Sequence, residues 1–210
     1  MEIINFLLHT NTYIGEFIQS YGALVYLLLF VIIFCETGLV FLPFLPGDSL
    51  LFAAGTFAGI GKLNFWILLI ILILSAIIGD LVNYMIGKKF GEKIIHNKKI
   101  KLIKEEDIEK ANGFIKKHGA KAIFFARFIP IIRTVVPFLV GIGKLEYKTF
   151  FKYNAIGAVA WVSICLSAGY FFGNIKFVEN NISAIMLGIV FVSMLPIFIG
   201  AFKAKFNKNK

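Results

Sequence analysis

Residues 63–87 form an apolar run that is long enough to cross a lipid bilayer, and similar runs cover 150–172 and 182–202. A membrane-spanning helix needs about 20 predominantly apolar residues. Apolar residues make up 59% of this chain, whereas they make up about 45–50% of soluble domains. Because a spanning segment must satisfy its own backbone hydrogen bonds, the sequence predicts an all-α integral membrane protein.

The distribution of positive charge predicts the topology. Residues 1–61 contain no lysine or arginine, whereas residues 88–121 contain 11 lysines and the tail after Phe202 contains four. Lysine-rich segments beside spans remain in the cytoplasm and attract anionic lipid headgroups. We therefore place the connector 88–118 and the C-terminus in the cytoplasm. This pattern makes the net charge of +10 a topology signal and argues against nucleic-acid binding.

Two further apolar segments, 21–61 and 119–143, are interrupted by proline and glycine. The residues that interrupt them are Pro43, Pro46, Gly47, Pro130 and Pro137. The second segment has cytoplasmic connections at both ends, so it must enter the membrane and return on the same side. Irregular backbone at this depth is tolerated where it is buried in protein or lines a wet cavity. We predict that both segments are re-entrant helical hairpins.

An internal repeat links the two hairpins. The sequence at residues 59–63 recurs unchanged at 141–145, and at the same offset Gly87 matches Gly169. Each half is a broken segment followed by a full span, and the charge pattern gives the halves opposite orientations. The prediction is an inverted repeat of a re-entrant hairpin plus a transmembrane helix, with an extra C-terminal transmembrane helix at 182–202.

The N-terminal residues 1–19 mix apolar and polar side chains in the manner of a short amphipathic helix at the membrane interface. Residues 21–41 alone are long enough to span the bilayer. The side of the membrane on which the N-terminus lies therefore stays open.

Arginine is confined to two positions in this lysine-rich chain. Of the 22 basic residues, all but Arg127 and Arg133 are lysine, and both arginines lie in the second hairpin. An ionisable group at membrane depth costs about 2.5–3.5 kcal/mol and is a functional hypothesis by default. The guanidinium group grips phosphate or carboxylate bidentately. We predict that both arginines bind an anionic substrate; structural ion pairing and snorkelling are the alternatives.

Acidic residues in the apolar segments are the expected partners. Glu36 and Asp48 lie in the first hairpin, and we predict that they face the arginines and can carry protons, because burial favours the neutral carboxyl form. Asp48 follows Pro46 and Gly47 and could instead cap a helix. Asp80 and Tyr84, one helical turn apart, are predicted to support the site by hydrogen bonding. The hairpin residues Pro46, Gly47, Pro130 and Pro137 are predicted to support it by breaking the helices.

We expect no enzyme activity, cofactor or metal. Cys35 and Cys165 each lie in an apolar segment and are interpreted as small core residues. No constellation of Cys, His or Ser in the sequence offers a nucleophile with a base in reach.

Several motifs together resemble the DedA family, also called SNARE-associated or VTT-domain proteins, over about residues 20–175. Their residues are Glu36, Pro46, Gly47, Asp48, Gly79, Asp80, Tyr84, Gly87, His118, Gly119, Ala126, Arg127, Phe128, Pro130, Arg133, Thr134, Pro137, Gly141, Tyr153, Asn154, Gly157 and Trp161. The resemblance implies a bacterial inner-membrane protein with two opposed re-entrant hairpins. It also implies functional roles for four charged residues: Glu36, Asp48, Arg127 and Arg133.

Some members of that family are lipid flippases that return undecaprenyl phosphate to the cytoplasmic leaflet, and others support membrane homeostasis that depends on the proton motive force. The sequence therefore predicts a flippase for a polyprenyl phosphate such as undecaprenyl phosphate, coupled to protons and supporting lipid-carrier recycling. The alternatives are a proton-coupled cation antiporter and a less selective phospholipid scramblase. Membrane lipids and protons are the expected partners.

Overall fold

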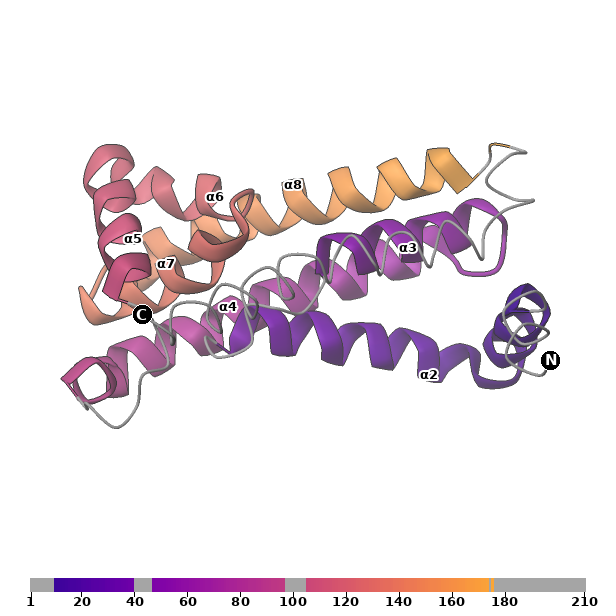
Figure 1. Ribbon diagram of the computed structural model, residues 1–210, viewed down its shortest axis with the longest axis horizontal. Helices are drawn as coiled ribbons and strands as arrows, with labels where there is room; N and C mark the ends of the chain where they lie inside the picture. The colour runs from indigo at the N-terminus through magenta and orange to yellow at the C-terminus, as the bar shows by residue number, and fades with distance from the viewer. Residues whose placement is uncertain (1–9, 40–46, 97–104, 174, 176–210) are drawn as a thin grey trace, which may run out of the picture. The chain divides into compact units, whose positions relative to one another are not determined.

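The computed structural model describes residues 10–39, 47–96, 105–173 and 175. Within these ranges the chain is helical and contains no β-strand. The elements are α2 (Thr10–Gly38), α3 (Gly47–Gly59), α4 (Phe65–His96), α5 (Glu105–His118), η1 (Gly119–Lys121), α6 (Ala122–Ala126), α7 (Pro130–Ile142) and α8 (Tyr147–Gly173); Figure 1 labels most of them. The predicted span at 182–202 and Pro46 lie outside the described residues.

Within the described residues, two helices are long and apolar enough to cross a membrane. The candidate spans are Phe65–Gly91 in α4 and Tyr147–Phe172 in α8, which correspond to the predicted spans 63–87 and 150–172. The side chain of Asn64 starts α4 by accepting hydrogen bonds from the backbone N–H groups of Trp66 and Ile67.

The surfaces of these helices are apolar, and their buried faces carry polar groups. Large exposed apolar side chains recur along both helices: Trp66, Ile67, Ile70, Leu74, Ile78, Met85, Tyr147, Phe151, Ile156, Val159, Ile164, Phe171 and Phe172. Asp80, Asn83 and Asn154 are buried on the same helices. Soluble proteins show the opposite arrangement, so this surface fits a hydrocarbon environment.

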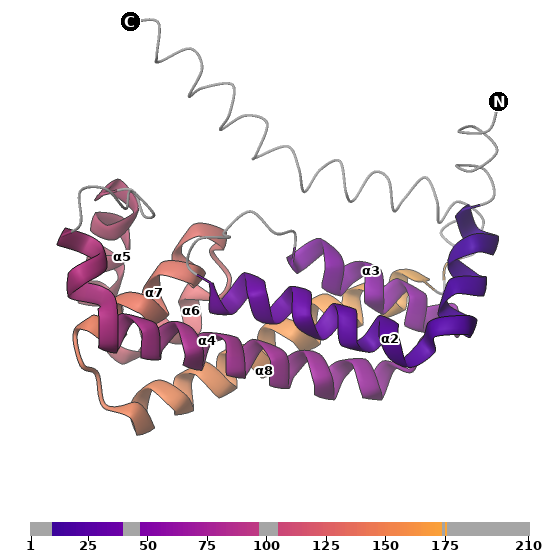
Figure 2. The ribbon, with the colours of Figure 1, turned by 90° about the horizontal axis from the view of Figure 1, so that it is seen from below.

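The sequence suggested an interfacial helix over 1–19 and a separate hairpin over 21–61. Residues 1–9 lie outside the described residues, and α2 covers the rest of the first segment and the start of the second, from Thr10 to Gly38. Figure 2 shows the first turns of α2 bent sharply away from the rest of the helix. Helix α3 begins at Gly47 with Asp48 in its first turn, and Pro43 and Pro46, which were predicted to interrupt this segment, lie outside the described residues. Whether α2 and α3 form a re-entrant hairpin stays a prediction.

By the density of its internal contacts the chain divides into two compact units: residues 28–45 with 69–164, and residues 1–27 with 46–68 and 165–210. In the first of these, α5, α6 and α7 pack against one another. Figures 1 and 2 show these three helices grouped near the C-terminal end of α4. Their core includes Tyr84, Ile123, Val136, Phe138 and Phe150.

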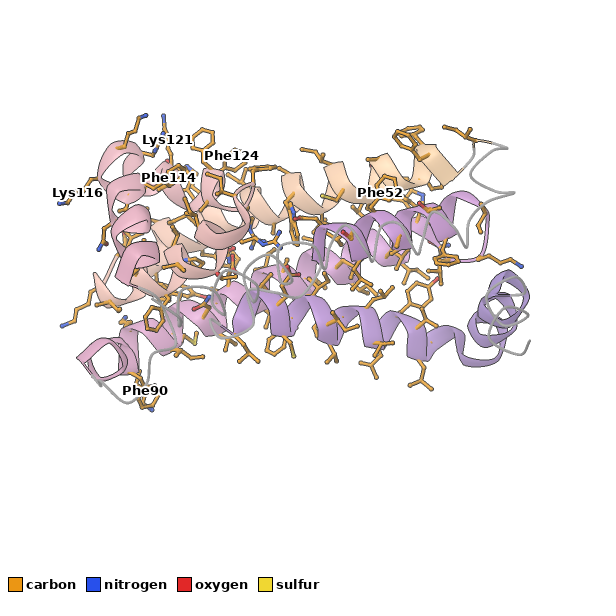
Figure 3. The ribbon with its side chains drawn as sticks, in the orientation of Figure 1. Phe52, Phe90, Phe114, Lys116, Lys121 and Phe124 are labelled. Atoms are coloured by element: carbon orange, nitrogen blue, oxygen red, sulfur yellow. The ribbon has the colours of Figure 1, made fainter. Side chains whose placement is uncertain are left out.

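Helix α5 lies in the predicted cytoplasmic connector 88–118, and it does more than bridge two segments. Phe114 and Ile115 pack against the core on its apolar side. Lys116 is exposed at the end of the helix, as is Lys121 in the following turn, and Figure 3 shows both side chains directed outward. The connector therefore anchors the second broken segment as well as carrying charge.

The prediction for Pro137 was wrong. The sequence predicted that it would interrupt the second hairpin, yet it lies inside α7, which continues to Ile142. Proline cannot donate a hydrogen bond to the carbonyl group of Arg133, which normally weakens a helix. Val136 and Phe138 on either side of it are fully buried, so tertiary packing outweighs the lost bond.

The glycines of the sequence repeat make equivalent helix crossings, one in each compact unit. A Cβ atom placed on Gly87 of α4 would lie 2.1 Å from the carbonyl oxygen of Phe138 in α7. A Cβ atom placed on Gly169 of α8 would lie 2.0 Å from the carbonyl oxygen of Phe52 in α3. The repeat is thus structural: each of these glycines permits contact between two helix backbones.

Candidate functional site

The break between α6 and α7 positions both arginines. Helix α6 ends at Ala126, Ile129 is extended with φ −119° and ψ 108°, and Pro130 starts α7. The extended conformation of Ile129 and the start of α7 both follow from Pro130, because the residue before proline avoids the α conformation and proline suits the first helical turn. Arg127 consequently lies at the break and Arg133 lies in the first turns of α7, with 3% and 9% of their surfaces exposed.

Arg127 is held by three acceptors on two helices. Its Nη2 group donates to Asp80 Oδ2 at 2.5 Å, to Asn154 Oδ1 at 2.6 Å and to the carbonyl oxygen of Ala76 at 3.2 Å. Asp80 is only 3% exposed, so this is a buried ion pair. The Asn154 amide also donates to the carbonyl oxygen of Ile77 at 3.2 Å, which joins α4 to α8 beside the pair.

One face of α8 forms a seat for Arg127. Asn154, Gly157 and Trp161 share this face, because residues three and seven positions apart align on a helix. A Cβ atom on Gly157 would lie 3.1 Å from Arg127 Cδ, so the missing side chain leaves room for the arginine. The Trp161 ring centroid lies 5.8 Å from Arg127 Cζ, within cation–π range.

Arg133 forms a second buried ion pair beside the first. Its Nη2 group donates to Glu36 Oε1, and Glu36 is 1% exposed. Arg133 Cζ lies 5.1 Å from the centroid of the same Trp161 ring. One indole therefore contacts both guanidinium groups, and the four charges of the two pairs sum to zero.

Asn83 joins the backbones of the two segments that carry the second pair. Its Nδ2 group donates to the carbonyl oxygens of Thr37 at 3.2 Å and Thr134 at 2.8 Å. These threonines directly follow Glu36 and Arg133 in the sequence, and Asn83 is fully buried. The amide therefore sets the distance between the segment carrying the carboxylate and the segment carrying the arginine.

One of the two acids predicted to face the arginines is seen in an ion pair with one of them. Glu36 contacts Arg133, as its expected position opposite the arginines suggested. The carboxylate on Arg127 is Asp80, which the sequence had assigned a supporting role. Asp48 belongs to the other compact unit and is exposed in the first turn of α3, where a negative charge favours the helix dipole.

Tyr84 lies one turn from Asp80, but its contacts are with the turn after α7 and with α8. Its hydroxyl group donates to the carbonyl oxygen of Leu145 at 2.6 Å, and its ring stacks on Phe150 at 4.5 Å. It thereby ties α4 to the turn between α7 and α8. Gly47, also predicted to support the site, is buried at the start of α3.

Three residues of this centre were not assigned site roles from the sequence: Asn83, Asn154 and Trp161. The sequence nevertheless contains a signal for each of them, because a polar or amphipathic side chain in an apolar span must find a partner. Asn154 and Trp161 also belong to the motif that carried the family resemblance. Spacing on α8 could have placed them on one face, but not opposite Arg127.

Long apolar helices around a buried ionic centre define a helical membrane protein. A family model for the VTT domain matches residues 45–171. Protein DedA of Escherichia coli is 46% identical over 196 residues, which cover 92% of this chain and 90% of that protein. The inner membrane protein YghB of Escherichia coli is 31% identical over 175 residues, covering 83% and 78% of the two chains.

An uncharacterised membrane protein of Mycobacterium tuberculosis is 37% identical over 173 residues, covering 81% of this chain and 76% of that protein. No solved structure matches the chain. With these similarities the chain belongs to the VTT-domain family, also called the DedA family.

Proposed function

We propose that this protein is a lipid transporter that moves a polyprenyl phosphate, such as undecaprenyl phosphate, across the bacterial inner membrane and so supports lipid-carrier recycling. The observation that carries the proposal is the buried pair of Arg133 and Glu36 in a protein with an apolar surface. A guanidinium group binds phosphate as well as carboxylate. A lipid phosphate can therefore replace the Glu36 carboxylate on Arg133 while the prenyl chain stays in the hydrocarbon.

Proton coupling follows from the same exchange. A proton that binds the Glu36 carboxylate removes its negative charge and weakens its hold on Arg133, which then accepts the phosphate. Loss of that proton restores the carboxylate, which competes with the phosphate and promotes its release. Asp48 is the second acid that we propose as a proton carrier, with its exposed position at the start of α3 giving access to protons.

The proposed orientation uses the charge pattern of the chain. We place the connector 88–118 and the C-terminus in the cytoplasm, the segments 21–61 and 119–143 as opposed re-entrant hairpins, and 182–202 as a further span. The name of the relative YghB, an inner membrane protein, supports the inner membrane as the location. Labelling that found residues 105–118 on the outer side would overturn this orientation.

A reconstituted assay tests the proposal. Purified protein is placed in proteoliposomes with labelled undecaprenyl phosphate, and exposure of the lipid on each leaflet is followed with and without a pH gradient. We expect flipping that the gradient accelerates. Arg133→Lys keeps the charge but loses the planar fork, so it should abolish flipping while the protein remains folded. Wild-type protein that leaves the lipid on its original leaflet would refute the function.

A proton-coupled cation antiporter is the second candidate, favoured by the buried carboxylates of Glu36 and Asp80. In that case the carboxylates would carry the cargo and the arginines would adjust their affinity for protons. The same proteoliposomes separate the two functions, because an antiporter moves cations without moving the lipid and tolerates Arg133→Lys. Movement of ordinary phospholipids at the same rate would instead indicate a scramblase.

A further inference from the structure

Arg127 is fixed by acceptors on two helices, and we propose that the two buried ion pairs have different tasks. We infer that Asp80 and Arg127 form a positioning pair whose two charges can be removed together without loss of transport. Glu36 and Arg133 form the pair that exchanges with the transported phosphate. This division rests on the proposed function and, for Arg127, replaces the prediction that both arginines bind the substrate.

The contacts of Arg127 support a positioning role. Its Nη2 group already serves Asp80, Asn154 and the carbonyl oxygen of Ala76. Its arm lies against α8, because a Cβ atom on Gly157 would be 3.1 Å from Cδ and 3.4 Å from Nε. A phosphate that bound the Nη2 group would have to displace acceptors on both α4 and α8. The Nε group, which has no hydrogen-bond partner among the described residues, faces Gly157 of α8. Arg127 is therefore built into the contact between these helices.

Trp161 provides the route from the positioning pair to Arg133. The indole centroid is 5.8 Å from Arg127 Cζ and 5.1 Å from Arg133 Cζ, and the ring is 2% exposed. Because Arg127 fixes α8 beside α4, it also fixes this ring. The ring in turn forms a wall next to Arg133. Arg127 thus acts on the substrate through Trp161 and not by contact.

The energetics of buried ion pairs make the proposal testable. Removing one partner leaves an uncompensated buried charge and is strongly destabilising, whereas replacing both partners by neutral groups is often tolerated. Asp80→Asn and Arg127→Gln should each disrupt the protein, and the double variant should recover. Transport recovers in the double variant only if the Arg127 charge does not hold the substrate.

The experiment compares two matched sets of variants. One set contains Asp80→Asn, Arg127→Gln and their combination; the other contains Glu36→Gln, Arg133→Gln and their combination. Melting temperature is measured in detergent without added lipid. The flipping rate is measured in proteoliposomes across a range of undecaprenyl phosphate contents, so that the apparent KM and the maximal rate are obtained separately.

We expect each single variant to lower the melting temperature by roughly 10 °C and both double variants to recover at least half of that loss. The Asp80→Asn/Arg127→Gln protein should flip lipid with an apparent KM within about threefold of wild type, since threefold is less than 1 kcal/mol of binding. The Glu36→Gln/Arg133→Gln protein should be folded but inactive.

Two results would overturn the division of tasks. A stable Asp80→Asn/Arg127→Gln protein that is inactive, or whose apparent KM rises more than tenfold, would show that Arg127 contacts the substrate. A double variant as unstable as its single variants would show that the pair is not exchangeable for neutral groups. If wild-type protein moves no lipid, the proposed function fails, and the melting temperatures still decide whether the two charges of the positioning pair depend on each other.

Discussion

Replacing Asn83 with leucine tests whether one buried amide joins the segments that carry the Glu36–Arg133 pair. Leucine has the same branching and number of heavy atoms as asparagine, so the change replaces the amide by two methyl groups and removes the donor shared by two carbonyl groups. The carbonyl of Thr37 lies in the last turn of α2, where the helix offers it no partner. The carbonyl of Thr134 lies inside α7 and depends less on the amide.

The expected cost follows from these two environments. A buried acceptor left without a donor costs about 1–3 kcal/mol, and an acceptor that keeps another bond loses about 0.5–1 kcal/mol. The oxygen of the Asn83 amide is buried with no hydrogen-bond partner among the described residues, and removing it returns about 1 kcal/mol. The net destabilisation is about 2 kcal/mol, or about 4–8 °C in melting temperature for a chain of this size.

The assay is thermal unfolding in detergent, followed by the flipping measurement on protein that is still folded. Asn112→Leu is the matched control, because Asn112 is exposed on α5 and should change the melting temperature by less than about 1 °C. The Asn83→Leu protein should also flip lipid more slowly, since Glu36 and Arg133 lose a shared anchor. A melting temperature equal to that of the control would refute the reasoning.

Three further variants test the surrounding structure. Gly157→Ala crowds Arg127 and should lower the melting temperature by about 2–4 °C, measured in detergent; an unchanged value would argue against the seat on α8. Gly87→Ala places a Cβ atom 2.1 Å from a carbonyl oxygen and should reduce the folded fraction in size-exclusion chromatography, whereas Gly113→Ala meets nothing within 4 Å and should not. Tyr84→Phe should cost about 1 kcal/mol of stability and leave the apparent KM for the lipid unchanged.

The scarcity of charge in the apolar segments was sufficient to predict an ionic centre. A buried arginine requires a counter-charge, and few acids lie in the apolar part of the sequence. Glu36 could therefore be expected near an arginine, and the structure pairs it with Arg133. The partner of Arg127 could not be derived in this way, because the pairing depends on how far α4 and α6 are rotated about their axes. Asp80 consequently received a supporting role.

Predictions from local sequence alone were also wrong or incomplete where tertiary packing decides the structure. Both Pro130 and Pro137 were expected to interrupt the second hairpin, but only the first begins a helix, and the second is held inside α7 by buried neighbours. The seat formed by Asn154, Gly157 and Trp161 was unrecognised as a site for a related reason. Sequence spacing shows that the three share a face of α8, and the fold decides what that face contacts.

The confinement of arginine to two positions has a physical explanation in this arrangement. Both guanidinium groups lie within cation–π distance of one indole while each engages a carboxylate. A planar guanidinium group can stack and donate at the same time, whereas a lysine ammonium group is a compact and strongly hydrated point charge. Lysine at either position would have to leave the ring or the carboxylate, and its hydration would be lost at greater cost. The chain can therefore use lysine at its surface and needs arginine where two cations share a single buried ring.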